Sequence, residues 1–235
     1  MQNISDQLVQ SAVEIQNLTK LYGEFRAVDD ISFTIRKNEI FGLLGPNGAG
    51  KTTIFNVITG VYKPTSGEIN FNGQSLVGKK RHQVTKMGIA RTFQNIRLFG
   101  DMTALENVIT ATDVHKKTGL LRALIGTPLN RREEKESKAR AHELLALMGI
   151  DHRADQLAKN LPYGDQRRLE IARALATNPQ LVLLDEPFAS QDLQSIARII
   201  EMMQAKKNRG ITFVVVAHAH RADLIWADAV IDITN

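Results

Sequence analysis

The chain has 235 residues, no cysteine, and a formal net charge of +5 from 30 basic and 25 acidic residues. Without cysteine it forms no disulfide and no thiolate metal site, and its hydrophobic fraction of 43% is that of an ordinary globular protein. No uncharged apolar run approaches the roughly 18 residues of a membrane-spanning helix, and the first ten residues resemble no secretory signal. We therefore expect a cytoplasmic protein whose scattered charges form a solvated surface and bind no nucleic acid.

The first predicted elements are strands with alternating apolar residues. Residues 13–15 and 31–35 alternate apolar with polar side chains, which is typical of half-buried strands. A third short strand, at 68–71, lies between two turn signals. Together these segments predict a small antiparallel sheet.

A glycine-rich segment with the pattern GxxxxGK(S/T) follows the apolar run at 40–44. Glycines let backbone N–H groups approach phosphate oxygens, and a helix beginning near Lys51 directs the positive end of its dipole at the same anion. Lys51 is expected to reach the β- and γ-phosphates, and the Thr52 hydroxyl to ligate Mg²⁺. A simple glycine turn is the alternative, but the preceding buried strand favours an ATP or GTP site. The predicted phosphate-binding residues are Gly45, Pro46, Asn47, Gly48, Ala49, Gly50, Lys51, Thr52 and Thr53.

The middle of the chain is expected to be helical. An apolar stripe runs along the helix predicted at 132–148, with Gly149 as its stop. Buried strands are then expected at 181–184 and 211–216, separated by a helix whose apolar residues span 193–203. This order predicts a parallel α/β core with an inserted helical subdomain.

Two adjacent carboxylates, Asp185 and Glu186, end the apolar run at 181–184. Ligands bind beyond the carboxyl ends of parallel strands, so both acids are expected to face the phosphate loop. Asp185 is predicted to hold Mg²⁺, and Glu186 to orient and polarise the attacking water. The alternative is a helix N-cap, but two adjacent acids on so apolar a strand make it the weaker interpretation.

A third motif is the segment LPYGDQRRLEIAR at 161–173. It lies between the phosphate loop and the motif LLDEP at 183–187. With these motifs the chain resembles the nucleotide-binding subunit of ATP-binding-cassette (ABC) transporters, from Val13 to about Ile233. The resemblance implies one ATPase domain over 11–235 with the α/β fold of P-loop NTPases. A RecA-like parallel core and an antiparallel β part are expected at 11–97 and 166–235, and a helical subdomain at about 98–165.

The resemblance also implies a dimer that encloses two ATP molecules. Each ATP is held by the phosphate loop of one subunit and by the segment at 161–166 of the other. The Gly164 N–H and a helix starting near Gln166 are suited to meet a γ-phosphate from that side, although read alone the segment could be a capped basic helix. The residues expected to act across the dimer are Tyr163, Gly164, Asp165, Gln166 and Asp192.

Three further side chains take their roles from the resemblance. Tyr22 corresponds to the aromatic residue that stacks on adenine, and Gln94 to the glutamine that senses Mg²⁺ and the attacking water. His218 corresponds to the switch histidine that bonds the γ-phosphate and orders Glu186, with His220 as the alternative register. Ordinary packing remains open for Tyr22. The implied catalytic set is Glu186, His218 and Gln94, and the implied Mg²⁺ set is Thr52, Gln94 and Asp185.

Within the family, the segment from Arg91 to Arg173 is most similar to the larger ATPase of branched-chain amino-acid importers. The similarity lies in residues 91–99, in a long insert at about 116–132 and in residues 163–173. That ATPase pairs with a shorter ATPase, two membrane permeases and a periplasmic binding protein, which implies a peripheral location on the cytoplasmic face of the inner membrane. Pro162 departs from the family, because it replaces a serine and offers neither a hydroxyl nor an N–H. A regulatory cassette with little hydrolysis therefore stays open, as does a soluble cassette without a transport role.

Overall fold

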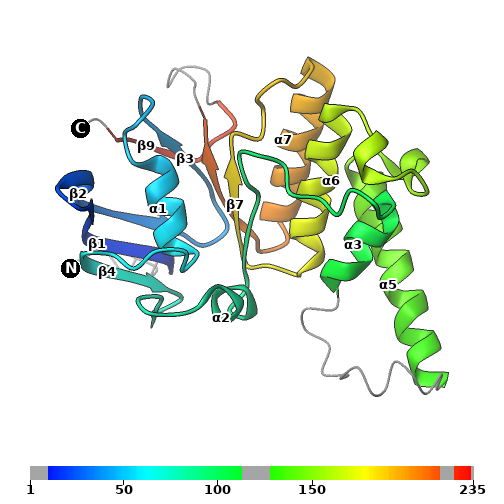
Figure 1. Ribbon diagram of the computed structural model, residues 1–235, viewed down its shortest axis with the longest axis horizontal. Helices are drawn as coiled ribbons and strands as arrows, with labels where there is room; N and C mark the ends of the chain where they lie inside the picture. The colour runs from blue at the N-terminus through cyan, green and yellow to red at the C-terminus, as the bar shows by residue number, and fades with distance from the viewer. Residues whose placement is uncertain (1–9, 113–127, 218–224, 234–235) are drawn as a thin grey trace, which may run out of the picture.

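The computed structural model describes residues 10–112, 128–217 and 225–233. These residues form a four-stranded antiparallel sheet and a five-stranded parallel sheet (Figure 1). The antiparallel sheet has the order β2-β1-β4-β5 and confirms the sheet predicted from the first strands. Its strands are β1 (Ser11–Tyr22), β2 (Phe25–Arg36), β4 (Ser66–Phe71) and β5 (Gln74–Ser75).

The parallel sheet separates two hydrophobic cores. Its strands follow the order β6-β7-β8-β3-β9, and neighbouring strands are parallel throughout. Successive side chains of a strand face opposite sides of a sheet. Accordingly, Leu181 and Leu183 of β7 join one core, whereas Val182 and Leu184 join the other. The strands are β3 (Ile40–Leu44), β6 (Ile89–Arg91), β7 (Leu181–Asp185), β8 (Thr212–Val216) and β9 (Ala229–Asp232).

Helices cover both faces of the parallel sheet. α1 (Lys51–Ile58) lies between the two sheets and supplies four apolar side chains to their shared core. α6 (Tyr163–Ala176) and α7 (Leu193–Lys207) cover the opposite face (Figure 1). The phosphate loop, which follows β3, and the end of β7 therefore both belong to the parallel sheet.

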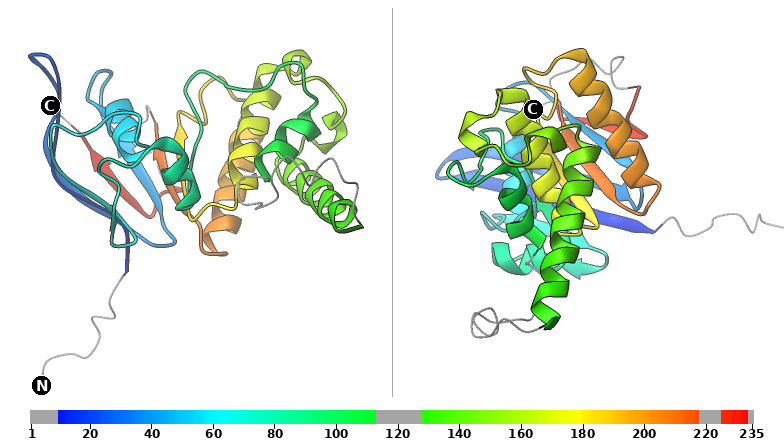
Figure 2. Two further views of the ribbon diagram at one scale, coloured as in Figure 1. Left: turned by 60° about the horizontal axis from the view of Figure 1, so that its bottom comes forward. Right: turned by 90° about the vertical axis from the view of Figure 1, so that its right-hand side faces the viewer.

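A helical part lies beyond α6, on the side away from the antiparallel sheet (Figure 2). It consists of α3 (Ala104–Thr112) and α5 (Pro128–Leu147), which pack against each other and against α6. Two 3-10 turns, Asp151–Arg153 and Ala158–Asn160, lead from α5 into α6. The short α2 (Arg81–Lys86) stands before β6 in the core part. The predicted combination of a parallel core, an antiparallel part and inserted helices is confirmed.

The long helix of this part begins earlier than expected, at Pro128 rather than at residue 132. Proline suits the first turn of a helix, where its missing N–H would have no partner. Gly149, with φ +70°, ends the helix as predicted. The predicted apolar stripe is buried and consists of Ala141, Leu144, Leu145 and Met148.

The helix expected near Gln166 in fact begins three positions earlier, so that prediction was wrong in its start. α6 opens at Tyr163 with Pro162 as N-cap, and the Gln166 N–H donates to the Pro162 carbonyl at 2.9 Å. Gly164 and Asp165 therefore lie in the first helical turn. Within the described ranges, no helix is long and apolar enough to cross a membrane.

Candidate functional site

The phosphate loop connects β3 to α1 and requires glycine at two positions. Gly45 has φ +146°, and a Cβ there would lie 2.5 Å from the Ile233 carbonyl oxygen. Gly50 has φ +92°, and its Cβ would lie 2.4 Å from the Ala27 carbonyl oxygen. Because both contacts are with backbone atoms, the neighbours cannot yield without moving a strand. The loop is therefore pressed against β2 and against the end of β9.

Replacing Gly50 with alanine is expected to reduce nucleotide affinity at least about tenfold, because the loop must shift to relieve the contact with Ala27. Gly78→Ala is the control: Gly78 also has a left-handed φ of +78°, but a Cβ there meets nothing within 4 Å. Both variants carry the same backbone strain, on the order of 1–2 kcal/mol. Titration with a fluorescent ATP analogue measures the difference. Equal affinities for the two variants would contradict the role of this close packing.

Lys51 is buried at the first position of α1, and its ammonium lies inside the loop. The Nζ donates to the carbonyl oxygens of Gly45 at 2.6 Å and Pro46 at 2.8 Å. Burial lowers the pKa of Lys51, and the negative charges of Glu186 and Asp185 oppose that shift. Phosphate oxygens would offer this ammonium charged acceptors, which form stronger hydrogen bonds than neutral carbonyls. The loop thus fits a polyphosphate.

One pocket combines four segments that are far apart in the sequence. The phosphate loop lines it from Asn47 to Thr53, and Gln94 and Glu186 line it from the loops after β6 and β7. Tyr22 lines it from the end of β1. The structure therefore places these predicted residues together. Phe25 and Ala27 line the same pocket and were not predicted.

The aromatic side of the pocket is built on the β1–β2 hairpin. Tyr22 pairs with Phe25 in the hairpin register, and both rings are exposed, at 39% and 64%. Tyr22 also meets Tyr62 edge to face, with ring centroids 5.5 Å apart. Exposed aromatic rings beside a phosphate loop can stack on a base. Phe25 was recognisable in the sequence only as the partner of Tyr22 across a tight turn.

Asp185 ends β7 and is almost fully buried, with Arg91 at its side. The Arg91 guanidinium lies 3.2 Å from Asp185 Oδ2 and also donates to Asn56 Oδ1 of α1 at 2.7 Å. Burial raises the pKa of Asp185, and the charge and hydrogen bond of Arg91 oppose that shift. Sequence reasoning missed Arg91, although an arginine that ends a buried strand requires an acidic partner.

Glu186 follows β7 in a left-handed conformation with φ +50°. Its N–H donates to the Val216 carbonyl at 3.0 Å, which fixes the turn to the neighbouring strand β8. A bulky residue with positive φ is uncommon and points to a functional constraint. The turn directs Glu186 to the pocket that the phosphate loop lines.

Four of the five residues predicted to act across a dimer lie outside this pocket, in the first turn of α6. Tyr163 is 49% exposed, and the first N–H groups of a helix have no partner within it. The carboxylate of Asp165 is buried between Arg168 and Arg153, so only its backbone N–H can serve a ligand. The Gln166 amide donates to the Leu161 carbonyl at 2.8 Å.

Asp192 and His218 are the remaining predicted residues, and the structure describes only the first of them. Asp192 caps α7, because its carboxylate accepts hydrogen bonds from the Ser195 N–H at 2.8 Å and the Ser195 hydroxyl at 2.9 Å. Its action across a dimer stays a prediction beside this capping role. His218 and the alternative His220 lie outside the described residues.

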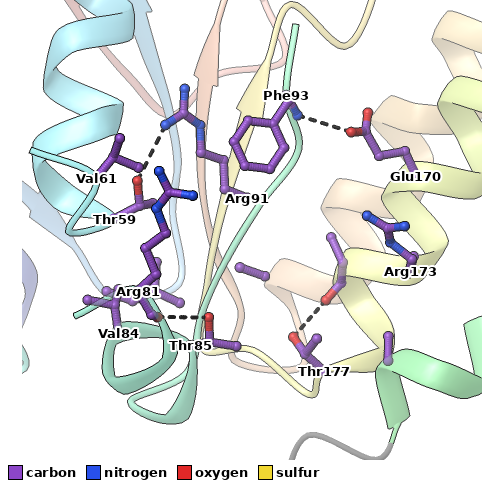
Figure 3. A pocket seen from close by; sticks show the side chains of 14 residues that line it. Thr59, Val61, Arg81, Val84, Thr85, Arg91, Phe93, Glu170, Arg173 and Thr177 are labelled. Carbon is purple, nitrogen blue, oxygen red and sulfur yellow. Dashed lines mark hydrogen bonds between the residues drawn. The ribbon is translucent and has the colours of Figure 1, made fainter. Parts of the chain in front are cut away.

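A second hollow lies between the core and the helical part (Figure 3). Its core side carries Arg81 of α2 and Arg91 of β6, and its helical side carries Glu170 and Arg173 of α6. Figure 3 shows the Phe93 N–H directed at Glu170 from the segment that leads to Gln94. This groove therefore adjoins, through Arg91 and Phe93, the two segments that carry Asp185 and Gln94.

Comparison with known proteins gives matches over nearly the whole chain. The family model of ABC transporters matches residues 28–189. The high-affinity branched-chain amino acid transport ATP-binding protein LivG of Salmonella typhimurium is 41% identical over 89% of this chain and 82% of its own. BraF of Pseudomonas aeruginosa, with the same description, is 36% identical over 95% and 88%. A dimeric post-hydrolysis structure of the ATP-binding cassette MJ0796, bound to ADP and Pi, aligns with TM-score 0.81 at 28% identity over 94% of each chain.

Proposed function

Because the chain belongs to the ABC transporter family, we propose that it is the ATP-binding and ATP-hydrolysing subunit of a membrane transporter. The observation that carries this proposal is the pocket in which the phosphate loop meets Glu186 and Gln94. A cassette that only binds nucleotide has no need of a glutamate held in a left-handed turn at the phosphates.

Each residue of the pocket has its own role in nucleotide binding or hydrolysis. Lys51 and the loop N–H groups bind the phosphates, and Tyr22 stacks on the base. Glu186 orients the attacking water and accepts its proton, and Gln94 positions the same water. We assign the switch role at the γ-phosphate to His218.

Thr52, Asp185 and Gln94 would hold Mg²⁺, a hard cation that prefers oxygen ligands. When bound, it neutralises the charge that develops on the β- and γ-phosphates. The Thr52 hydroxyl and the Gln94 side chain lie at the pocket wall. The Asp185 carboxylate is buried behind the wall against Arg91, so it would serve the ion only by giving up part of this pairing.

A complete site requires a second cassette, identical or related. The first turn of α6 presents the N–H groups of Tyr163 and Gly164 at an exposed face outside the chain's own pocket. A helix N-terminus of this kind binds the γ-phosphate of nucleotide held by a partner. The segments at about 98–165 would then move as a helical subdomain against the core at 11–97 and 166–235.

The groove in Figure 3 is the surface at which we place the membrane permease. Three arginines, Arg81, Arg91 and Arg173, and one acid, Glu170, line it among apolar side chains. A groove with an excess of positive charge among apolar side chains suits a short amphipathic helix of the permease that carries an acidic residue. We place the complex at the cytoplasmic face of the cell membrane, with this chain bound peripherally. Branched-chain amino acids are the proposed cargo, since LivG and BraF are described as serving their transport.

Recruitment of this chain to membranes tests the proposal that a permease is its partner. The chain should sediment with membranes when its permease is co-expressed and should remain in the supernatant with protein-free liposomes. Arg81→Glu is expected to reduce co-sedimentation at least about tenfold by reversing charge in the groove. Lys86→Glu is the control, because Lys86 lies on the same helix and is exposed outside the groove. Recruitment by bare liposomes, or equal losses in both variants, would contradict the docking site.

Uptake tests the function as a whole. Cells with the complete transporter should accumulate labelled leucine, isoleucine or valine, and Lys51→Ala in this chain should abolish accumulation while the complex still assembles. Purified chain without ATPase activity, even with its permease, would favour the regulatory cassette. Uptake of other solutes only would leave the ATPase role intact and overturn the proposed cargo.

A further inference from the structure

An ion pair is buried in the first two turns of α6, outside the nucleotide pocket. Arg167 and Glu170 lie 2.9 Å apart, and their side chains are 1% and 2% exposed. Such a pair pays a large desolvation penalty, and apolar residues of similar volume often stabilise a protein equally well or better. Stability alone therefore does not explain why these two charges stand in the core.

Both charges are directed at the backbone of one segment, residues 93–97. The Arg167 guanidinium donates to the Phe93 carbonyl at 2.6 Å and to the Gln94 carbonyl at 2.7 Å. Glu170 Oε1 accepts the N–H groups of Phe93 at 3.2 Å and Arg97 at 3.4 Å (Figure 3). The pair thus holds both the carbonyls and the amides of this segment, which we call the 93–97 segment.

The same arginine reaches the exposed end of the helix. Its second terminal nitrogen lies 3.4 Å from the Tyr163 hydroxyl, in the first turn of α6. On the other side, the 93–97 segment carries Gln94 to the wall of the nucleotide pocket. Arg167 is therefore in contact with both the turn proposed to meet a partner's nucleotide and the segment that carries Gln94.

We propose that Arg167 and Glu170 are positioning residues that couple the first turn of α6 to Gln94. This inference rests on the proposed function. When the first turn of α6 shifts with the helical subdomain toward a partner's nucleotide, Arg167 and Glu170 transmit the shift to the 93–97 segment and set Gln94 against the water that Glu186 activates. Neither side chain touches the nucleotide itself. Their loss therefore lowers turnover and leaves nucleotide affinity in the chain's own pocket unchanged.

The decisive variant is the double replacement Arg167→Met and Glu170→Met. It removes both charges together and fills a similar volume, so the fold is expected to persist. Glu170→Gln is the conservative companion, because its amide oxygen still accepts from Phe93 and Arg97, while the charge and the acceptor that Oε2 offers to Arg167 are lost. Arg168→Met is the control, since Arg168 neighbours Arg167 on the helix but pairs with Asp165 instead.

Three measurements separate coupling from structural damage. For the double variant we expect kcat to fall about 10- to 100-fold, as a small misplacement of a catalytic group can produce, with an unchanged Kd for a fluorescent ATP analogue. Amide exchange at Phe93 and Arg97 should accelerate in the absence of nucleotide. Glu170→Gln should recover most of the protection and part of kcat, and Arg168→Met should match the parent in all three.

The outcomes distinguish this inference from the function on which it rests. Suppose that the parent chain hydrolyses ATP and that the folded double variant has the same kcat as Arg168→Met. This result would overturn the proposed coupling and leave the proposed function intact. A parallel loss of Kd and kcat would also overturn it, because the pair would then act on the pocket as a whole. If the double variant does not fold, Glu170→Gln decides by the same comparison. A parent without ATPase activity would overturn the proposed function, and the coupling with it.

Discussion

Replacing Glu186 with glutamine is expected to reduce the rate of ATP hydrolysis by about 10²–10⁴-fold, the usual contribution of a general base. The glutamine keeps the shape of the side chain but cannot accept the proton of the attacking water. Lys51 and the loop glycines are unchanged, so nucleotide affinity should stay within about twofold of the parent. Phosphate release measured with saturating Mg-ATP gives the rate, and a fluorescent analogue gives the affinity.

The control for this variant is Glu201→Gln, which removes an exposed carboxylate from α7. It removes one negative charge, as Glu186→Gln does, and should leave hydrolysis unchanged. A Glu186→Gln variant that hydrolyses ATP at the parent rate would show that another group is the base. His218 would then be the first candidate, because its imidazole can accept a proton and its assigned place is at the γ-phosphate.

The phosphate loop and the strands around it were predictable because each depends on local chemistry. Gly45 and Gly50 are required by close backbone contacts, and the pattern of glycines is visible in the sequence. The strands of the parallel sheet are buried on both faces and therefore appear as uninterrupted apolar runs. Tyr22 could be placed only through the resemblance to a family, and the structure brings it to the loop.

The buried contacts of Asp185 with Arg91 and of Glu170 with Phe93 could not be predicted, because their partners are distant in the sequence. Arg91 and Asp185 are 94 residues apart, and Phe93 and Glu170 are 77 apart. In the sequence, Arg167 and Glu170 belong to a charged helix whose polar residues suggest a solvated face. Only the tertiary contacts show that this face is turned toward the 93–97 segment.

Residues that act across a dimer have no intrachain contact that reveals them. In the isolated chain, Tyr163 and Gly164 stand at the start of α6, where the Tyr163 hydroxyl contacts Arg167 of the same helix. Sequence reasoning placed that start near Gln166, three positions too late. The corrected start at Tyr163 places the N–H groups of Tyr163 and Gly164 at the helix terminus, where an anion binds.

In the Glu186→Gln variant, Mg-ATP is expected to convert monomers into dimers, because nucleotide is bound but not consumed. Ligand that binds only the dimer shifts the equilibrium by RT ln(1 + [L]/Kd) per site, about 2.7 kcal/mol at a hundredfold excess over Kd. Monomers also bind ATP through their own phosphate loop, so the measured shift should be smaller. Pro162 reduces it further, since it offers no hydroxyl to the γ-phosphate.

Light scattering of Glu186→Gln with and without Mg-ATP measures this shift, and adding Gly164→Glu provides the control. Gly164 lies outside the chain's own pocket, so the added substitution should leave ATP affinity unchanged while placing a carboxylate against a partner's γ-phosphate. We expect ATP to produce dimers with Gly164 intact and monomers with Gly164→Glu. If the natural assembly contains two different ATPases, the dimer forms only when the partner is mixed in. A chain that stays monomeric with ATP and with its partner, or a dimer indifferent to Gly164→Glu, would rule out the shared site. The start of α6 would then be an ordinary helix end, and this chain would hydrolyse ATP, if at all, with its own residues alone.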